Sequence, residues 1–135
     1  MSILKVVSKI GKIQNSDERV FNFLSDFRNF DRLIPPEVEG WQSDSNSCQF
    51  VVKGQTVGLL IVEREEFKTI KFQSSEGSAL PFMFWIQLIK KDIYDTRIRL
   101  TVHAEVNMVM KLALKKQLQK GLDQLVDQLS MIPYP

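Results

Sequence analysis

Two acidic residues are the best candidates for acid–base chemistry in the sequence. Glu63 and Glu65 stand two positions apart in a segment that alternates like a β-strand, so both side chains point to one side. If Val57, Leu59 and Ile61 face inward, the two carboxyls lie at the inward rim of an internal cavity. A raised pKa there would suit general acid–base catalysis, or the pair could hold a polar ligand group. Alternatively, the strand runs out into solvent and the charges pair with basic residues on neighbouring strands, which is the interpretation we favour.

The sequence contains one histidine, His103, and one cysteine, Cys48, on different predicted strands. Two donors so far apart do not form a zinc-binding cluster, and any Ser-His-Asp or Cys-His nucleophile would have to use His103. His103 alternates with charged residues, which indicates the outer face of its strand. Cys48 alternates with Phe50 and Val52, which is typical of a small buried hydrophobic residue rather than a reactive thiol. The sequence therefore predicts no metal site, no cofactor and no nucleophilic triad.

The overall composition is that of a soluble globular protein. Of the 135 residues, 44% are hydrophobic and 25% are charged, and the length suits a single domain spanning 1–135. A net charge of +2, without a Lys/Arg-rich run, argues against nucleic-acid binding. The apolar start of the chain is interrupted by Lys5 and Lys9, and no stretch approaches the roughly 20 apolar residues of a membrane span. We expect a cytoplasmic protein with no stable membrane insertion.

The first part of the chain is predicted to form one strand followed by two short helices. Residues 3–13 alternate loosely between apolar and polar, which suits a strand. Asn15 or Ser16 can cap the helix that follows with its side-chain oxygen, and acidic residues occupy the first turn, where the helix dipole favours them. Apolar residues then continue at helical spacing with a break near Ser25-Asp26, and Pro35-Pro36 ends the pattern.

The middle of the chain is predicted to form six strands joined by short turns. Connections of about two to six residues join antiparallel neighbours, because a parallel crossover needs a dozen residues or more. The six strands are therefore expected to form a meander. They span residues 38–42, 47–53, 57–66, 69–74, 81–90 and 96–106.

The last strand and the helix after it have the clearest hydrophobic patterns. Alternate residues from Ile98 to Val106 are apolar, which indicates one buried face and one face in water. Asn107 can cap a helix that runs to about Ser130. The apolar stripe of this helix consists of Leu114, Leu118, Leu122, Leu125 and Leu129.

These elements predict an α+β fold of the order β-αα-β×6-α. A helix with one apolar stripe and a meander with one apolar face must each bury that surface. The simplest solution is a curved antiparallel sheet wrapped around the long C-terminal helix, which is the helix-grip arrangement. Because one helix does not fill the concave side of six or seven strands, the remaining space becomes an apolar cavity.

Three segments carry a resemblance to a known family: the strand-to-helix opening at 15–26, the hairpin at 52–58, and the Asp95-Thr96-Arg97 entry to the last strand. Together they resemble the START-like (SRPBCC) helix-grip superfamily, which includes polyketide cyclase/dehydrase and birch-pollen-allergen-like proteins. The resemblance covers essentially the whole chain. It implies a START-like ligand-binding domain with a cavity for lipids, sterols, polyketides or similar molecules. None of these motifs is a catalytic signature, and fold alone does not determine function.

The expected ligand-binding residues come from the last two strands and the final helix. Gly121 lies beside the leucine stripe and leaves room either for close packing of a strand, which we favour, or for a ligand. Lys111 lies on the azimuth of the stripe and could reach a ligand carboxylate at the cavity mouth, although such lysines more often extend to water. The full set is Phe84, Ile86, Leu88, Ile98, Leu100, Val102, Lys111, Leu114, Leu118, Gly121 and Leu122.

Three functions are compatible with this architecture. The leading hypothesis is non-catalytic binding or transport of a hydrophobic small molecule or lipid in the internal cavity. The second is a cyclase/dehydratase-like enzyme acting on a polyketide-type substrate, with Glu63 or Glu65 as its acid. The third is a protein-interaction module whose cavity is filled by its own side chains. Trp85 adds apolar surface to the outer face of its strand, which a second copy of the chain could cover as a homodimer.

Overall fold

The structure is a computed structural model that describes residues 2–76, 78 and 80–135. Two helical segments near the start and a long helix at the end flank eight strands. The elements are β1 (Ser2–Val7), β2 (Gly11–Ile13), α1 (Asp17–Leu24), the 3₁₀ helix η1 (Phe27–Phe30), β3 (Val38–Ser43), β4 (Ser47–Val52), β5 (Gln55–Glu65), β6 (Thr69–Ser74), β7 (Phe82–Asp92), β8 (Asp95–Val106) and α2 (Met108–Ser130).

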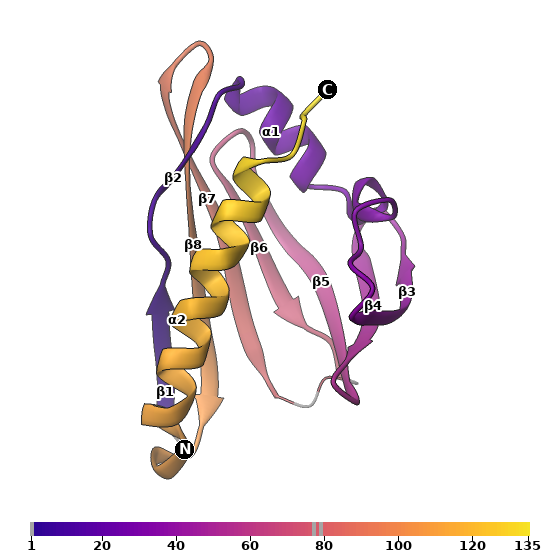
Figure 1. Cartoon of the computed structure of the whole chain (residues 1–135), viewed down its shortest axis with the longest axis vertical. Helices are drawn as coiled ribbons and strands as arrows, with labels where there is room; N and C mark the ends of the chain where they lie inside the picture. Colours follow the sequence, from indigo (N-terminus) through magenta and orange to yellow (C-terminus); the bar gives the residue numbers. More distant parts are fainter. Residues whose placement is uncertain (1, 77, 79) are drawn as a thin grey trace.

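The strands form one antiparallel sheet in the order β1-β8-β7-β6-β5-β4-β3, and β2 also pairs with β8. The predicted meander is therefore confirmed, because each strand from β3 to β8 lies beside the next one in the chain. Figure 1 shows the sheet curving behind α2, which runs lengthwise along the side of the sheet formed by β1 and β8. The α+β helix-grip architecture expected from the sequence is the one observed.

The single first strand expected over residues 3–13 is instead two strands. Ser8 interrupts it, and this residue is buried. Its hydroxyl accepts a hydrogen bond of 2.8 Å from the backbone N–H of Leu100, while its own N–H donates to the Leu100 carbonyl at 2.8 Å. The Ser8 hydroxyl thus takes the place of a backbone carbonyl facing β8, and the chain shifts before pairing with β8 again through β2.

Side-chain caps start each helix where the sequence indicates. Ser16, rather than Asn15, caps α1 by accepting a hydrogen bond from the backbone N–H of Arg19 at 3.2 Å. Asp26 starts η1 by accepting from the N–H of Arg28 at 3.0 Å. Asn107 caps α2 by accepting from the N–H of Met110 at 2.8 Å. The predicted pair of short helices is therefore confirmed, the second as a 3₁₀ turn.

The second half of α2 anchors the helix to the sheet. Leu122, Val126 and Leu129 are buried there in the same core as the inward residues of β1 and β8. Close approach to β2 is allowed by Gly11, because a Cβ at that position would lie 2.5 Å from Val126 Cγ1. The close-packing role that we favoured for Gly121 is wrong, since Gly121 is exposed and a Cβ there would meet nothing within 4 Å.

Candidate functional site

An apolar cavity of about 210 Å³ lies between the inner face of the sheet, the α1–η1 segment and the C-terminal half of α2. Aromatic rings form much of its wall: Phe72 packs against Phe27 and Phe84, with ring centroids 5.6 and 5.4 Å apart, and Trp41 packs against Phe50 at 5.7 Å. The residues that line it are Leu24, Phe27, Phe30, Ile34, Trp41, Cys48, Phe50, Leu59, Phe72, Phe84, Ile86, Leu125 and Leu129.

Two of the ligand-binding residues expected from the sequence, Phe84 and Ile86, lie on the cavity wall. Most of the others contribute to the core instead. Those that are buried in the core away from the lining are Leu88, Ile98, Leu100, Val102 and Leu122, while Leu114 and Leu118 pack against the core and are half-buried.

Lys111 and Gly121 do not lie on the cavity wall. The Lys111 ammonium donates a hydrogen bond to the hydroxyl of Ser2 at 3.2 Å, so it is held at the start of β1 rather than at a cavity mouth. The sequence pattern correctly gave the face of α2 that meets the sheet. The pattern did not show which turns of α2 line the cavity. That position depends on how the α1–η1 segment covers the end of the sheet.

Sequence reasoning missed the part of the wall contributed by α1, η1 and the first strands of the meander. The helical spacing of Leu24, Phe27 and Phe30 was visible, and it signals a face that must be buried. What that face covers could not be read from the spacing, because the curvature of the sheet decides which strands it meets.

A groove of about 420 Å³ adjoins the cavity on the outside. Phe30, Ile34, Leu125 and Leu129 line both spaces, so these four side chains separate the cavity from the groove. The remaining groove residues are Leu33, Pro35, Gln128, Met131, Ile132 and Pro133.

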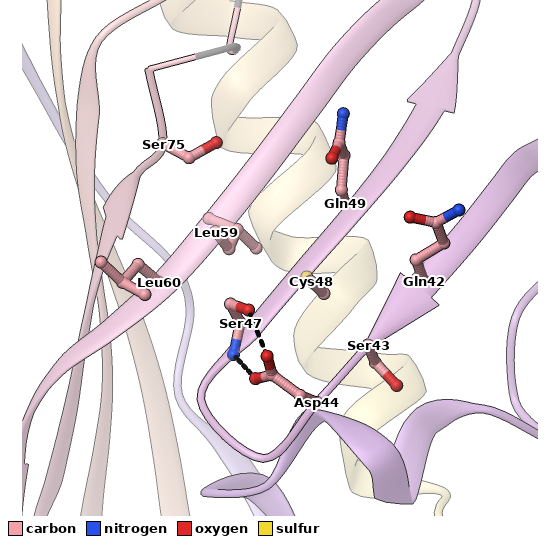
Figure 2. Close-up of a pocket in the computed structure, with 9 residues that line it drawn as sticks. All are labelled: Gln42, Ser43, Asp44, Ser47, Cys48, Gln49, Leu59, Leu60 and Ser75. Atoms are coloured by element: carbon pink, nitrogen blue, oxygen red, sulfur yellow. Dashed lines mark hydrogen bonds between the residues drawn. The ribbon is translucent and has the colours of Figure 1, made fainter.

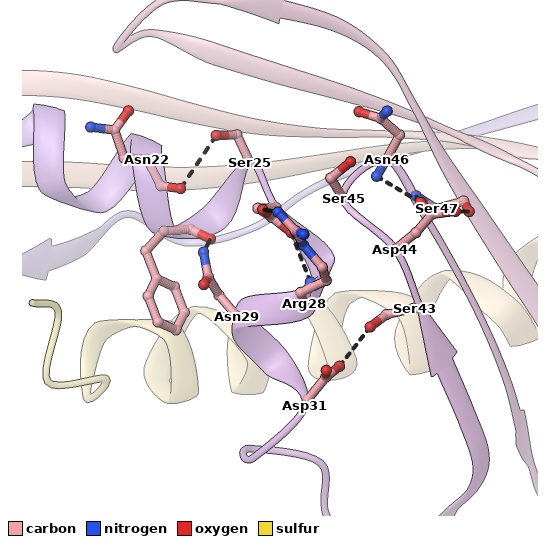
Figure 3. Close-up of polar contacts among 12 residues, drawn as sticks. Asn22, Ser25, Arg28, Asn29, Asp31, Ser43, Asp44, Ser45, Asn46 and Ser47 are labelled. Carbon is pink, nitrogen blue, oxygen red and sulfur yellow. Dashed lines mark hydrogen bonds and ion pairs between the residues drawn. The ribbon is translucent and has the colours of Figure 1, made fainter.

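A hydrogen-bonded latch ties the η1 segment to β3 beside the cavity. The Asp31 carboxylate accepts hydrogen bonds from Trp41 Nε1 at 2.7 Å and from the Ser43 hydroxyl at 2.6 Å, and Figure 3 shows the second contact. These two donors, the Ser43 hydroxyl first, hold the pKa of Asp31 below its usual value. Trp41 therefore presents its ring to the cavity while its only polar group is already bonded outside it.

Arg64 joins the end of α1 to the β3–β4 turn. Its guanidinium donates to the Ser25 carbonyl at 2.8 Å and to the Asn46 side-chain oxygen at 2.7 Å. Arg64 pairs with the fully buried Ile70, and residues paired across an antiparallel sheet share a face. Arg64 is therefore the inward-facing residue at this end of β5, and its guanidinium links the end of α1 to the β3–β4 turn.

The placement of Glu63 and Glu65 at an inward rim is wrong. Ile61 pairs with Phe72 and Glu63 pairs with Lys71, so Val62 is an extra residue on β5, a β-bulge. The bulge reverses the alternation, and both glutamates share the outer face with Lys71 and Thr69. They are exposed, which matches the solvent-facing interpretation of this acidic pair.

Cys48 lies on the cavity wall and is 6% exposed. Burial raises the pKa of its thiol to about 12, so the thiol is protonated at neutral pH. This agrees with its prediction as a small buried hydrophobic residue. The carboxylate, imidazole and ammonium groups of the described residues all lie off the cavity wall. The described residues also contain no group of three or more His, Cys, Asp or Glu side chains that could hold a metal ion.

His103 lies on the outer face of the sheet, as its alternation predicts. It is opposite Lys5 on β1, and its ring packs against Trp85 with centroids 4.6 Å apart. Burial, and then the charge of Lys5, lower the pKa of His103. It is separated from the cavity by the sheet itself.

Another hollow, of about 350 Å³, has largely polar walls and lies over β3, β4 and β5 (Figure 2). The carboxylate in the wall of this hollow is that of Asp44. It accepts hydrogen bonds from the backbone N–H groups of Asn46 and Ser47 at 2.8 and 2.7 Å. These bonds, with one from the Ser47 hydroxyl, lower the pKa of Asp44. The carboxylate therefore stabilises the β3–β4 turn and is not free for acid–base work.

Comparison with solved structures places this arrangement among known folds. Norcoclaurine synthase from Thalictrum flavum aligns with 96% of this chain and 85% of its own, with a TM-score of 0.76 at 14% sequence identity. A START superfamily protein from Mycobacterium smegmatis aligns with 93% of this chain and 98% of its own, with a TM-score of 0.63 at 20% identity. The fold is START-like.

A protein from Thermus thermophilus has a comparable likeness to this START-like chain, with a TM-score of 0.68 at 18% identity over 93% of this chain and 94% of its own. At these identities the likeness shows the fold alone. No family model and no curated protein matches the sequence. Among the described residues, no helix is long and apolar enough to cross a membrane.

Proposed function

We propose that this protein binds one small apolar molecule in the apolar cavity between its sheet and its helices without reacting with it. The observation that carries the proposal is the chemistry of the wall. The Trp41 N–H is bonded to Asp31 outside the cavity, and the Cys48 thiol is protonated and buried. The other lining residues are aliphatic or phenyl side chains. A ligand part that enters the cavity therefore gains from burial of apolar surface and finds no group that would compensate for a buried charge.

The size of the cavity selects the ligand class. A cavity of about 150 Å³ lined by Leu, Ile and Phe is enough to bind benzene, so about 210 Å³ accommodates one or two aromatic rings or a short alkyl chain. Pockets for larger ligands typically occupy about 300–1,000 Å³. A larger molecule would have to extend past Phe30 and Ile34 into the adjoining groove, where Gln128 is available for its polar end.

The likeness to norcoclaurine synthase supports a ring-sized ligand, because that protein was solved in complex with dopamine and hydroxybenzaldehyde. A cyclase/dehydratase-like reaction receives no such support from the site, since the glutamates proposed as its acids lie on the outer face. An interaction module with a filled interior is also less well supported, because about 210 Å³ of apolar space remains open.

Two neighbouring leucines on β5 provide a matched test. Leu59 lines the cavity, whereas Leu60 is 42% exposed and does not. Leu59→Phe should fill part of the cavity, and Leu60→Phe should leave it unchanged. The melting temperature of each variant and of the wild type would be measured with a panel of one-ring and two-ring aromatics, short fatty acids, long fatty acids and sterols.

We expect a matched ligand at 100 times its Kd to stabilise the wild type and Leu60→Phe by about 2.7 kcal/mol, and Leu59→Phe by much less. Long fatty acids and sterols should stabilise the wild type less than ring-sized compounds. Equal responses of the two variants, or no response of the wild type to any compound in the panel, would contradict the proposal. Native mass spectrometry of the purified protein would identify a ligand retained from the cell.

A further inference from the structure

The start of α2 exposes apolar side chains that the fold does not use. Met108 is 79% exposed, Val109 is 90% exposed and Leu112 is 81% exposed, and all three lie in the first two turns of the helix. We refer to these three residues as the α2 patch. Neither the cavity nor the groove includes any of them. Each of these apolar side chains would stabilise the protein if its surface were removed from water, and in the isolated chain that free energy is not gained.

Basic residues surround the α2 patch. Four lysines, Lys111, Lys115, Lys116 and Lys120, lie between Met108 and Lys120, and that stretch contains no acidic residue. None of the four forms an ion pair with another described residue. Cations are unfavourable near a helix N-terminus, where the dipole attracts negative charge. Lys111 therefore lies in the one turn of α2 where the stability of the helix alone would favour an acidic residue, and the three lysines that follow extend the positive charge along the helix.

We propose that the start of α2 is a docking surface for an anionic lipid bilayer. Exposed apolar side chains on one side of a helix, flanked by lysines, are the features of a helix that lies in a membrane interface. The apolar side chains would enter the headgroup region, and the lysines would contact the negative headgroups. Neither part requires a membrane-spanning segment, in keeping with the absence of a helix of that kind among the described residues.

Charge and area argue against a second copy of the chain as the occupant. Pairing two α2 patches face to face would bring the exposed Lys115, Lys116 and Lys120 of each copy together, with no acidic residue in the same stretch to balance them. The patch spans five residues of helix, about 8 Å at 1.5 Å per residue. That is far too small for the roughly 800 Å² per partner that a stable dimer buries.

The β7–β8 hairpin supplies a natural control. Ile93 and Tyr94 are 63% and 62% exposed, and Lys90 and Lys91 precede them, but Asp92 and Asp95 lie beside them. Figure 1 places this hairpin at the end of the molecule opposite the start of α2. The hairpin is thus similar in exposed apolar surface and different in charge.

The test is co-sedimentation of the full chain with phosphatidylcholine vesicles, with and without phosphatidylserine. The wild type should sediment with the vesicles that contain phosphatidylserine and should be released by salt. Val109→Gln with Leu112→Gln should weaken binding at least tenfold. Lys115→Gln with Lys116→Gln should weaken it about thirtyfold, from the usual contribution of each lysine near an anionic surface. Ile93→Gln with Tyr94→Gln should bind like the wild type.

Failure of the wild type to sediment with phosphatidylserine vesicles at low salt would overturn the proposal. So would equal loss of binding in the hairpin variant, or dimers in the wild type that disappear in the Val109→Gln, Leu112→Gln variant. Circular dichroism would establish that the variants fold, as is expected for substitutions of exposed residues. Leu59→Phe should still bind vesicles, so failure of the cavity proposal and failure of this one give different results.

Discussion

The packing of α2 against β2 can be tested with two glycines that occupy contrasting positions. At Gly11 a Cβ would lie 2.5 Å from Val126 Cγ1 and 2.7 Å from Ser130 Oγ, and Val126 is fully buried. At Gly121, in the exposed middle of α2, a Cβ would meet nothing within 4 Å. Alanine at each position adds the same methyl group, once into a filled contact and once into water.

The two substitutions should change the free energy of unfolding in opposite directions. Gly121→Ala should stabilise the protein by about 1 kcal/mol, because alanine is the better helix former and nothing obstructs it. That gain corresponds to a rise in melting temperature of roughly 4 °C for a chain of this length. Gly11→Ala forces α2 away from β2, and overpacking of this kind costs about 1–3 kcal/mol. The reduced entropy of the unfolded chain offsets part of that cost.

Urea unfolding followed by circular dichroism gives both free energies. Gly11→Ala should also weaken ligand binding, because Leu125 lies next to Val126 on α2 and lines the cavity, whereas Gly121→Ala should not. A Gly11→Ala protein as stable as the wild type would show that α2 does not lie against β2 as described. The position of the cavity wall would then be wrong as well.

Three further predictions follow from the site. Trp85→Phe leaves Trp41 on the cavity wall as the only tryptophan, so its fluorescence should change when a ligand binds, whereas Trp41→Phe, which keeps Trp85 on the outer face, should show no change. The Cys48 thiol, with its pKa raised to about 12, should react with a thiol reagent at pH 8 much more slowly than a free cysteine, and unfolding in urea should abolish the difference. The free energy of unfolding should fall as the pH drops below the ordinary histidine pKa of about 6.5. The pKa of His103 is lowered in the folded state, so the unfolded chain binds the proton first. His103→Gln should remove this dependence of the free energy of unfolding on pH between pH 7 and 5.

Much of the fold could be predicted because strong local signals agree with the tertiary structure. The alternation from Ile98 to Val106 and the cap at Asn107 were visible in the sequence, and both elements begin and end within a residue or two of the prediction. Ser8 was not recognised as a break, since nothing in the pattern shows that a serine hydroxyl will replace a backbone acceptor. Gly121 attracted attention over Gly11 because a glycine within a helix is conspicuous, whereas one in a short strand is not.

The cavity was predicted in kind and only partly in place. Phe84 and Ile86 were identified because they alternate on a strand next to the centre of the sheet. Trp41, Phe50 and Leu59 were missed, because the curvature that brings β3, β4 and β5 toward η1 is a property of the whole sheet rather than of any one segment. Glu63 and Glu65 were misplaced for a local reason, the extra residue at Val62.

That extra residue makes β5 unusual in its tolerance of changes in length. Without Val62, Ile61 would still oppose Phe72 and Glu63 would still oppose Lys71, so each later side chain would keep its side of the sheet. Deletion of one residue at this point should therefore change stability little. Deletion of one residue elsewhere in β5 would turn the side chains that follow it from the inner face of the sheet to the outer face, and the reverse. Aligning homologues without a gap here would place the two ends of the strand out of phase, and would assign acids to an interior that they never enter.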